Sequence, residues 1–393
     1  MTTIGIGTSQ NPDAELAAKQ AAVQAKTQLR QDRIDLAVIF YTIDYHPKKT
    51  LPVIQAVLNS NRLIGSCTAG LILTDQIIPS GIAVLAIRSD EWELNTASSE
   101  PATLQDPYLA GTTLAQTITE KFGPRSRNTM LFFADGHMIN ERMMLKGMQE
   151  ILGNVFPIIG AGSCDDFHFR TTPQIYENKI LESSATGLMF GGRSRVAIGG
   201  RHGWHPLGKP RIITAAYGNI IQSIDNKPAA HLYKEYFGQD FENFAEKRWS
   251  KLALIYPLGI LLPESNKYLI RNIIDILDDG SIVCQGVVPA RHEAHIMIGN
   301  KDSCLEAAST AAEEARSGLL GQPPKLLMIF ESMARIKLLG RNAFQEAQSI
   351  KKIFPGIPLF GMYTNGEIFP FQSTENIFQS YLQNENIVIL AVS

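Results

Sequence analysis

The chain has 393 residues, of which 45% are hydrophobic and 19% are charged, and its formal net charge is -2. This composition is typical of a folded protein, and the length favours two domains over one. The charge gives no sign of a surface for nucleic acid, and no apolar stretch approaches the roughly 20 residues of a membrane span. We therefore expect neither a nucleic-acid nor a membrane partner.

The N-terminus, Met1 to Gly5, has neither a basic start nor an apolar segment, so we expect no secretory signal. The cysteines form no C-x-x-C pair and have no histidine at a spacing suited to zinc. They are Cys67, Cys164, Cys284 and Cys304. These observations favour a reduced, cytoplasmic protein without a metal site.

A short strand at residues 4–7 is followed by an alanine-rich helix over residues 13–29 and a buried strand over residues 36–41. Asn11, Pro12 and Asp13 predict the start of this helix. A polar cap, a proline in the first turn and an acidic side chain all favour a helix N-terminus.

One unit recurs along the chain. It has a buried strand, a short helix, an apolar segment ending in glycine, a loop of small residues and a second strand. The copies span residues 36–87, 130–190 and 326–392. The preceding strand and helix recur at residues 92–121 and 295–316, and a partial fourth copy fits residues 220–256. We predict an α/β fold in which internally duplicated strand–helix–strand units form mixed sheets flanked by helices.

The sequence changes character between residues 191 and 226. Residues 211–216 and 220–224 predict one β-hairpin, and residues 273–277 and 281–283 predict another. We place a domain boundary near Asp225, which divides the chain into residues 1–224 and 225–393. No long linker is present, so we expect two closely packed halves.

Motifs spread over nearly the whole chain resemble those of the FIST proteins, which are intracellular sensory proteins with an N-terminal and a C-terminal FIST module. The N-terminal signature is similar at residues 63–70. The C-terminal signature is similar at residues 203–208, residues 225–229 with Tyr233, residues 268–272, residues 280–281 and residues 358–367. By this resemblance, residues 1–224 are a FIST N-like domain and residues 225–393 a FIST C-like domain.

The resemblance implies a cytoplasmic sensory module that binds a small ligand such as an amino acid. Relatives are often fused to kinase, chemoreceptor or cyclic-dinucleotide domains, and some bind haem and respond to nitric oxide. No output domain is visible in this sequence. We therefore expect a stand-alone version that signals through a partner such as a kinase or a cyclic-dinucleotide enzyme.

The loops after the strand glycines are the first candidate for a ligand site. Small residues at strand ends can offer backbone N–H groups and hydroxyls to a carboxylate or phosphate. Alternatively, these glycines only turn the chain tightly. The candidates in the first two loops are Gly65, Ser66, Thr68, Gly160 and Ser163.

The third loop is the strongest candidate, because it adds Tyr363, Thr364, Asn365 and Glu367. Glu367 could pair with an ammonium group, and Tyr363 could cover the ligand. The alternative for Glu367 is a salt bridge or another contact within the protein.

Arg271 and Arg335 complete the predicted ligand site. Arg271 stands in an apolar segment, so an inward-facing guanidinium there needs a partner. The carboxylate of a small molecule such as an amino acid would serve, through a bidentate contact. A protein carboxylate would serve equally well.

Residues 201–206 combine aromatic and basic side chains and support a haem alternative. His202 and His205 could ligate haem iron, with Trp204 packed on the macrocycle. The structural alternative is a connecting segment whose tryptophan fills an interface and whose histidines bond to the backbone. We expect no cofactor.

A cysteine-dependent enzyme is a further alternative, because Cys67 and Cys164 stand in small-residue loops that could stabilise a thiolate. His46, His137 and His168 are candidate bases. Their spacing forces none of them close to a cysteine, and the chain has no nucleophile elbow, P-loop or dinucleotide-binding glycine motif after a strand. We therefore expect a binding protein rather than an enzyme.

Overall fold

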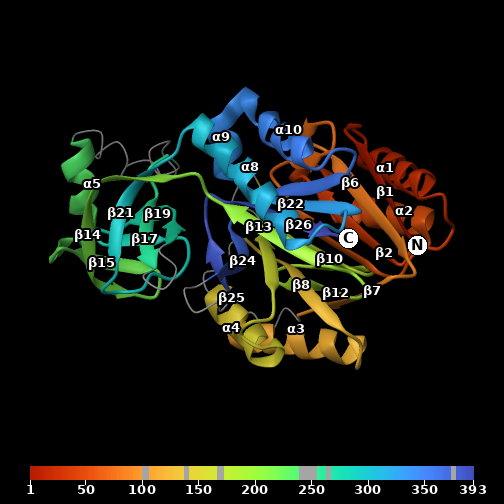
Figure 1. Ribbon diagram of the computed structural model, residues 1–393, viewed down its shortest axis with the longest axis horizontal. Helices are drawn as coiled ribbons and strands as arrows, with labels where there is room; N and C mark the ends of the chain where they lie inside the picture. The colour runs from red at the N-terminus through yellow and green to blue at the C-terminus, as the bar shows by residue number, and fades with distance from the viewer. Residues whose placement is uncertain (100–105, 137–140, 166–171, 239–254, 263–266, 373–377) are drawn as a thin grey trace.

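The structure is a computed structural model that describes the whole chain except residues 100–105, 137–140, 166–171, 239–254, 263–266 and 373–377. In the described residues the strands form three six-stranded sheets and one eight-stranded sheet. The six-stranded sheets, with their helices, make the body of the molecule, and the eight-stranded sheet makes a separate lobe (Figure 1). The predicted α/β fold with mixed sheets and flanking helices is confirmed.

The first six-stranded sheet, sheet A, is covered on one face by α1 (Ala14–Leu29) and α2 (Pro47–Leu58). Asp13 caps α1 as predicted, since its carboxylate accepts the N–H of Leu16 at 2.9 Å. The alanines of α1 let the helix lie directly on the sheet. In spatial order the strands are β1 (Thr2–Ser9), β6 (Ile82–Ser89), β2 (Leu36–Tyr41), β3 (Leu63–Cys67), β10 (Gln174–Tyr176) and β11 (Lys179–Leu181).

The second sheet, sheet C, is covered by α3 (Pro107–Phe122) and α4 (Glu141–Leu152). Its strands in spatial order are β25 (Phe378–Gln383), β24 (Glu367–Gln372), β9 (Ile158–Gly162), β8 (Arg127–Ala134), β12 (Ala185–Gly192) and β7 (Trp92–Ser98).

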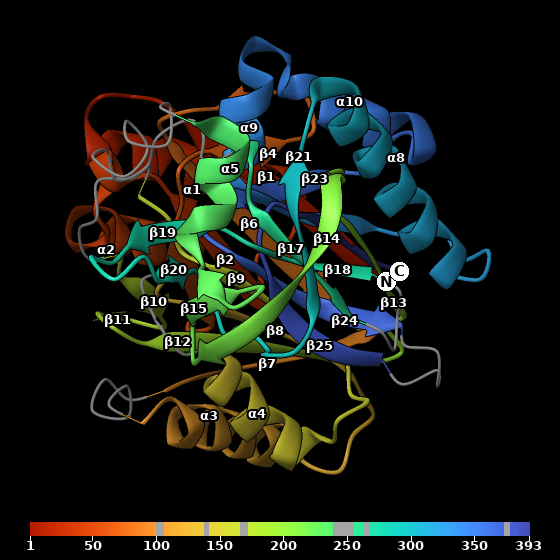
Figure 2. The same ribbon diagram turned by 90° about the vertical axis from the view of Figure 1, so that its left-hand side faces the viewer.

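The third sheet, sheet B, is covered by α8 (Lys301–Gly318) and α10 (Phe344–Ile353), with the short α9 (Met333–Leu339) at the end of β22. Its strands in spatial order are β13 (Val196–Arg201), β26 (Ile387–Val392), β22 (Leu326–Ser332), β23 (Leu359–Thr364), β4 (Leu71–Leu73) and β5 (Ile77–Ile78). The three helix pairs therefore lie on three sides of the body (Figure 2).

Each six-stranded sheet belongs to one copy of the repeat, and the copies exchange hairpins in a cycle. The hairpin after β3 (β4–β5) completes sheet B, the hairpin after β9 (β10–β11) completes sheet A, and the hairpin after β23 (β24–β25) completes sheet C. No copy therefore builds its own sheet alone.

Two predicted assignments in the repeat are wrong. The third copy begins with β13, which pairs with β26 in sheet B, and not with residues 295–298. Those residues belong to β21 (Glu293–Ile298) in the antiparallel lobe. The partial fourth copy at residues 220–256 also lies in the lobe as far as the structure describes it. In both segments the order of strand and helix along the chain matches the repeat, but the strands pair with strands of the lobe and not with those of a six-stranded sheet.

The lobe is inserted between β13 and α8, where the first copy has only residues 10–13 between β1 and α1. The predicted hairpins are confirmed as β14–β15 and β19–β20. The helix of the lobe is α5 (Ala230–Phe237). Its strands are β14 (His205–Tyr217), β15 (Ile220–Ile224), β16 (Lys227–Pro228), β17 (Leu258–Leu262), β18 (Lys267–Arg271), β19 (Ile273–Ile276), β20 (Ile282–Cys284) and β21. The division at Asp225 stays a prediction.

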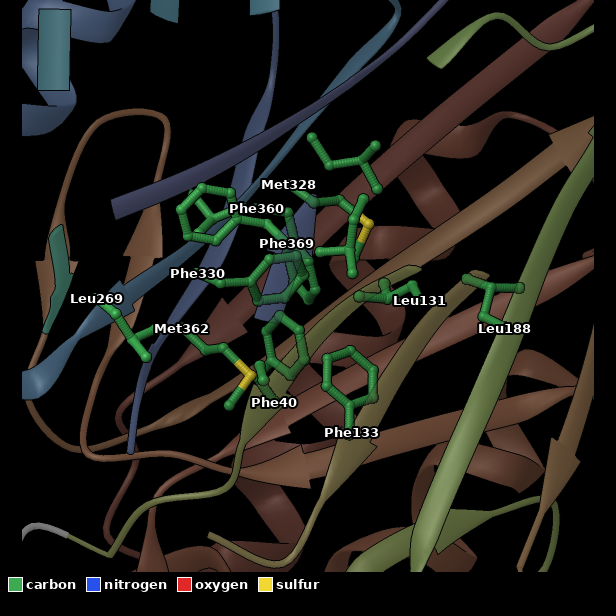
Figure 3. Close-up of a cluster of buried hydrophobic side chains, with 14 of the residues drawn as sticks. Phe40, Leu131, Phe133, Leu188, Leu269, Met328, Phe330, Phe360, Met362 and Phe369 are labelled. Carbon is green, nitrogen blue, oxygen red and sulfur yellow. The ribbon is translucent and has the colours of Figure 1, made fainter. Parts of the chain in front are cut away.

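The inner faces of the three sheets share one core (Figure 3). Phe40, Phe133 and Phe330 hold the same position in β2, β8 and β22, as their cross-strand partners show. The ring centroids of Phe40 and Phe133 are 5.4 Å apart, and those of Phe133 and Phe330 are 6.0 Å apart. Because strand side chains alternate, the intervening residues pack against the helices instead.

The glycines Gly65, Gly160 and Gly361 occupy one equivalent position in the three copies, and their backbone torsions are compatible with other residues. The constraint is space. An ideal Cβ would lie 2.5 Å from the Ile39 carbonyl oxygen at Gly65 and 2.5 Å from the Ile329 carbonyl oxygen at Gly361. At Gly160 it would lie 2.4 Å from the ring of Phe132.

Substituting Gly361 with alanine should lower the free energy of unfolding by about 1–3 kcal/mol, because the added methyl meets a backbone oxygen that cannot rotate away. Urea unfolding measures this change. A matched control is Gly187→Ala in strand β12, where the nearest atom is the flexible Cε of Met130 at 2.9 Å. Equal stability of Gly361→Ala and the wild type would contradict the close-approach argument.

Candidate functional site

The three predicted strand-end loops are tied to one another by backbone hydrogen bonds that form a closed ring. One N–H of the second loop and two of the third donate to carbonyl oxygens of the other loops, at 3.0 to 3.2 Å. The pairs are Cys164 N to Cys67 O, Asn365 N to Gly162 O and Tyr363 N to Gly70 O. Backbone donors that the sequence offered to a ligand are therefore used between the loops.

The hydroxyls of the first two loops are also engaged within the protein. Thr68 Oγ1 lies 2.7 Å from the carbonyl oxygen of Tyr363, which joins the first loop to the third. Ser163 Oγ lies 2.7 Å from Thr172 Oγ1 and accepts the N–H of Gly136 at 3.1 Å. Ser66 is fully buried. The ligand role predicted for Gly65, Ser66, Thr68, Gly160 and Ser163 stays a prediction.

The third loop places Glu367 in the interior, with no exposed surface. Its carboxylate accepts hydrogen bonds from Thr364 Oγ1 at 2.5 Å and from Asn386 N at 3.1 Å. Burial raises the pKa of Glu367 to about 8, although these two donors act in the opposite direction. A buried carboxyl with this pKa carries its proton through part of the neutral range.

Arg335 also lies fully buried, beside Glu367. Burial acts to lower the pKa of Arg335, but Glu346 and the neighbouring acidic groups hold it above its ordinary value. All five N–H groups of the guanidinium have protein acceptors. They are Glu346 Oε1 at 3.1 and 2.5 Å, Cys304 O at 2.9 Å, Glu385 O at 3.1 Å and His202 O.

Further carboxyl groups crowd this arginine. Burial, then Glu346, raises the pKa of Glu331. Burial, then Glu367, also raises the pKa of Glu385, whose backbone has a positive φ of 65°. Asn272 acts in the opposite direction, yet within the described residues neither oxygen of Glu385 has a partner at hydrogen-bonding distance. Strained, unsatisfied groups of this kind gather at functional sites.

Two of the other predicted residues, Arg271 and Asn365, lie where the lobe meets the body, whereas Tyr363 packs inside the body between sheet B and its helices. Arg271 Nη1 donates to the carbonyl oxygen of Leu382 at 3.1 Å, across that contact. Asn365 accepts from Gln285 Nε2 at 2.9 Å. Tyr363 is buried, and its hydroxyl has no hydrogen-bond partner in the described residues. The structure thus brings Thr364, Glu367 and Arg335 into one buried cluster and leaves Arg271 outside it.

A cleft of about 400 Å³ opens next to this cluster, between the body and the base of the lobe. Lys267 and Tyr268 of β18 line one side, and Ser303 and Glu306 of α8 line another. Residues 200–206 and Asn386 complete the wall. The sequence marked residues 201–206 as unusual, but it gave no reason to join Lys267, Glu306 and Asn386, which are far apart along the chain.

Cationic side chains gather at the cleft, and one of them, Arg201, is ion-paired with Glu314, which acts to raise the pKa of Lys267. Burial lowers the pKa of His202 to about 3, and Arg335, Arg201, His205 and Lys267 lower it further in that order. Burial, then Arg201, also lowers the pKa of Lys267. Cations that disfavour one another's charge favour an anion in their midst.

His202 and Trp204 do not suit the haem roles predicted for them. The N–H of Trp204 donates to Nδ1 of His202 at 3.0 Å, so the proton of the neutral ring sits on Nε2, the atom that would bind iron. Trp204 is 2% exposed, and its indole N–H donates to the carbonyl oxygen of Ile255 at 3.2 Å. It fills an interface in the core and presents no ring face to a macrocycle.

The cysteines offer little thiolate character. Cys67 is fully buried, and burial, then Cys164, raises the pKa of its thiol. Cys164 is 3% exposed, with Met333 Sδ 2.8 Å from its sulfur. His46 caps α2 by accepting the N–H of Lys48. The other two predicted bases, His137 and His168, lie outside the described residues.

The comparisons with known proteins agree with the sequence motifs. A FIST N domain profile matches residues 35–227, and a FIST C domain profile matches residues 229–370. The chain belongs to the FIST family. The FIST chain is 23% identical over 374 residues to an uncharacterised protein of Mycobacterium tuberculosis (strain H37Rv), covering 93% of this chain and 94% of that protein.

A second relative of this FIST protein is an uncharacterised protein of Methanocaldococcus jannaschii, 24% identical over 248 residues, which are 57% of this chain and 46% of the relative. Among solved structures, a cyanuric acid hydrolase from A. caulinodans covers 49% of this chain and 71% of its own, with 10% identity and a TM-score of 0.30. That score is too low to support any argument about function.

Two kinds of feature are missing from the described part of this FIST chain. No helix there is long and apolar enough to cross a membrane. No group of three or more histidine, cysteine or acidic side chains there is arranged to hold a metal ion.

The raised pKa of Glu367 predicts that stability decreases with increasing pH. The folded state holds the proton more tightly than the unfolded state, so the stabilisation is complete below about pH 4.5 and is lost as the pH rises through about 8. Urea unfolding at a series of pH values should show this decline, and Glu367→Gln should make it shallower. The exposed control Glu15→Gln should keep the wild-type slope, and an unchanged slope in Glu367→Gln would contradict the assignment.

Removing Arg335 should strongly destabilise the FIST fold. Arg335→Met leaves Glu346 buried without its counter-charge, a loss of about 3–5 kcal/mol in the free energy of unfolding. The double variant Arg335→Met/Glu346→Gln should recover part of that loss, because it removes the uncompensated charge. The control Arg316→Met breaks an exposed pair with Glu313 and should change stability by less than about 1 kcal/mol. Equal effects of Arg335→Met and Arg316→Met would argue against a buried charge cluster.

Proposed function

We propose that this FIST protein is a non-catalytic sensor that binds a small molecule with a carboxylate, such as an amino acid, in the cleft at the base of the lobe, and that it signals through a partner protein. The observation that carries the proposal is the composition of the cleft wall. Lys267 and Arg201 supply positive charge, although Arg201 is also ion-paired with Glu314. Asn386 lines the same cleft, and its side-chain oxygen has no hydrogen-bond partner among the described residues.

The size and chemistry of the cleft support a small ligand. Sites for small molecules span roughly 300–1,000 Å³ and combine apolar walls with a few polar groups. Here Tyr268 and Ala307 supply apolar surface, and Ser303 supplies a hydroxyl. Glu306 is the acid that could pair with an ammonium group. We keep the ligand class expected from the sequence and move its site from the third loop to this cleft.

The engaged state of the third loop supports this move. The N–H groups of Arg335 and the carboxylate of Glu367 already have protein partners, so a ligand there would have to break buried hydrogen bonds. Asn386 connects the two places, because its backbone N–H bonds to Glu367 while its side chain lines the cleft. A ligand that contacts Asn386 in the cleft would therefore affect the hydrogen bond between Asn386 and Glu367 in the buried cluster.

The position of the cleft supports a sensory role. Lys267 and Tyr268 belong to the lobe, whereas Glu306 and Asn386 belong to the body. A ligand that contacts both parts stabilises one relative arrangement of them by its differential affinity. A partner protein that contacts both parts would then distinguish the bound form from the free form.

The buried, protonated cysteines support a non-catalytic protein. Burial raises the pKa of the Cys284 and Cys304 thiols to about 12, and it also raises the pKa of the Cys67 thiol. Nucleophilic catalysis by cysteine needs a thiolate in a partly exposed, electropositive site.

The test is a thermal-stability screen of the full chain with amino acids and simple carboxylates, followed by calorimetric titration of any ligand found. At 100 times its Kd a ligand of the folded state adds roughly 2.7 kcal/mol, which raises the melting temperature by a few degrees in a chain of this size. Lys267→Gln should weaken binding about tenfold or more. Glu306→Gln should lower the affinity for an amino acid but leave the affinity for a carboxylate without an ammonium group unchanged.

Lys209→Gln is the matched control, because Lys209 is an exposed lysine of the same lobe outside the cleft. It should leave the affinity unchanged. The cleft is the wrong site if Lys267→Gln binds as tightly as the control. If Glu367→Gln alone abolishes binding, the ligand sits at the third loop instead. No response to any carboxylate at millimolar concentration would contradict the ligand class.

A further inference from the structure

A groove of about 610 Å³ lies between the outer edge of sheet A and the hairpin that completes sheet B. Ile4, Ile6 and Thr8 of β1 form one wall, and residues 73–76 of the β4–β5 hairpin form the other. Ile4 and Ile6 are only half-buried, although they belong to a strand of the body.

The other two copies of the repeat fill the equivalent space with an aromatic ring. In the second copy, Tyr176 reaches from its hairpin to β7, where its hydroxyl donates to the carbonyl oxygen of Thr96 at 3.4 Å, and Lys121 caps the hydroxyl at 2.6 Å. In the third copy, the ring of Phe369 packs on β13. A Cβ built at Gly200 would lie 2.4 Å from that ring.

The first copy has leucine at the same place. Tyr176 pairs with Ile64, the residue before the strand glycine of its sheet. Leu73 pairs with Phe360, which stands in the same relation to Gly361. Phe369 follows Ile368, which pairs with Gly160. The three residues are therefore equivalent, and Leu73 leaves open the space that a ring closes in the other copies.

The edge of β1 beside the groove is capped by side chains rather than by a strand. Gln28 Oε1 accepts the N–H of Ile6 at 3.0 Å, and Gln24 Oε1 accepts the N–H of Thr8 at 2.8 Å. Such caps keep an edge strand from pairing indiscriminately. The carbonyl oxygens of an incoming strand could replace these amide oxygens one for one, without loss of hydrogen bonds.

We propose that this groove is a docking site for an extended segment of a partner protein, which pairs with β1 and inserts an aromatic side chain next to Leu73. The internal repeat indicates that the inserted side chain is aromatic, because the equivalent wall packs against a tyrosine in the second copy and a phenylalanine in the third. The volume of the groove indicates an extended segment rather than a single side chain, because 610 Å³ holds far more than one aromatic ring. Addition of a strand to a free sheet edge, with pockets for its side chains, is a common mode of peptide recognition.

The rim of the groove favours a segment without strong net charge. Asp75 and Lys351 face each other across it, with 2.8 Å between Oδ1 and Nζ. Opposite charges on the rim attract neither a strongly acidic nor a strongly basic segment.

The test uses methyl NMR spectra of the full chain titrated with an acetylated and amidated peptide of sequence Thr-Val-Tyr-Val-Thr. The matched peptide has alanine in place of tyrosine, and p-cresol serves as the ring alone. We expect saturable shifts of the methyl signals of Ile4, Ile6 and Leu73, with an affinity at least tenfold higher for the tyrosine peptide than for the other two probes.

Leu73→Phe should fill the groove with a ring, as Tyr176 and Phe369 do in the other copies. It should lower the affinity for the tyrosine peptide at least tenfold. Ile6→Lys, at a half-buried position, gives a second variant that does not depend on repacking. Val155→Phe adds a ring at an exposed site away from the groove and should bind as the wild type does. Equal affinity for the alanine peptide or p-cresol, unchanged binding in both groove variants, or no shift at millimolar peptide overturns the proposal.

Discussion

The hydrogen-bonded ring of the three strand-end loops fixes how the sheets of the body are arranged. Each loop follows the third strand of its copy, so the ring holds three sheets at one end, with their inner faces toward Phe40, Phe133 and Phe330 (Figure 3). The small residues that suggested ligand contact from the sequence are needed to let the loops approach. Gly162, for example, would place a Cβ 2.4 Å from the carbonyl oxygen of Asn365. Space for a ligand therefore lies outside the ring, at the contact between body and lobe.

Arg335 is the main link from the body to the entrance of the lobe. Its guanidinium bonds to the carbonyl oxygens of His202, where the chain leaves the body, and of Glu385, which precedes the last strand. The contact between lobe and body combines hydrogen bonds, such as those from Asn272 N to Asn384 and from Ile270 N to Gln383, with an apolar cluster that joins Ile270 and Met297 of the lobe to the body. Polar contacts between domains permit relative motion more readily than hydrophobic ones do.

Local features of the fold could be predicted from the sequence. Asp13 caps its helix, and turn residues such as Gly218 and Gly280 mark the two hairpins of the lobe, because these signals act over a few residues. Strand pairing could not be predicted in the same way. The segment 295–298 has the composition of the first strand of a repeat, but its partners are β14 and β17 of the lobe. Which strands lie next to this segment in space determines its pairing, and the composition of the segment gives no information about those neighbours.

The candidate site shows the same division. Glu367 and Arg335 could be recognised as groups that need partners when buried, and both are buried. The sequence could not reveal that Glu346 and three backbone carbonyl oxygens accept the hydrogen bonds of Arg335, since those partners come from distant segments. Asn386 and Lys267, 119 positions apart by their numbers, meet in the cleft only because the lobe is inserted between β13 and α8.

The cyclic exchange of hairpins also governs how the molecule can be made. Sheet B has β26, residues 387–392, between β13 and β22, and sheet C receives β24 and β25 from the third copy. Neither sheet can close while only the first half of the chain has left the ribosome. Until then, the edges of β9 and β13 are bare, and strand edges of this kind invite pairing with other chains. With so many contacts between distant segments, folding should be slow, and a chaperone that shields strand edges during synthesis would protect this architecture more than it would protect three independent domains in a row.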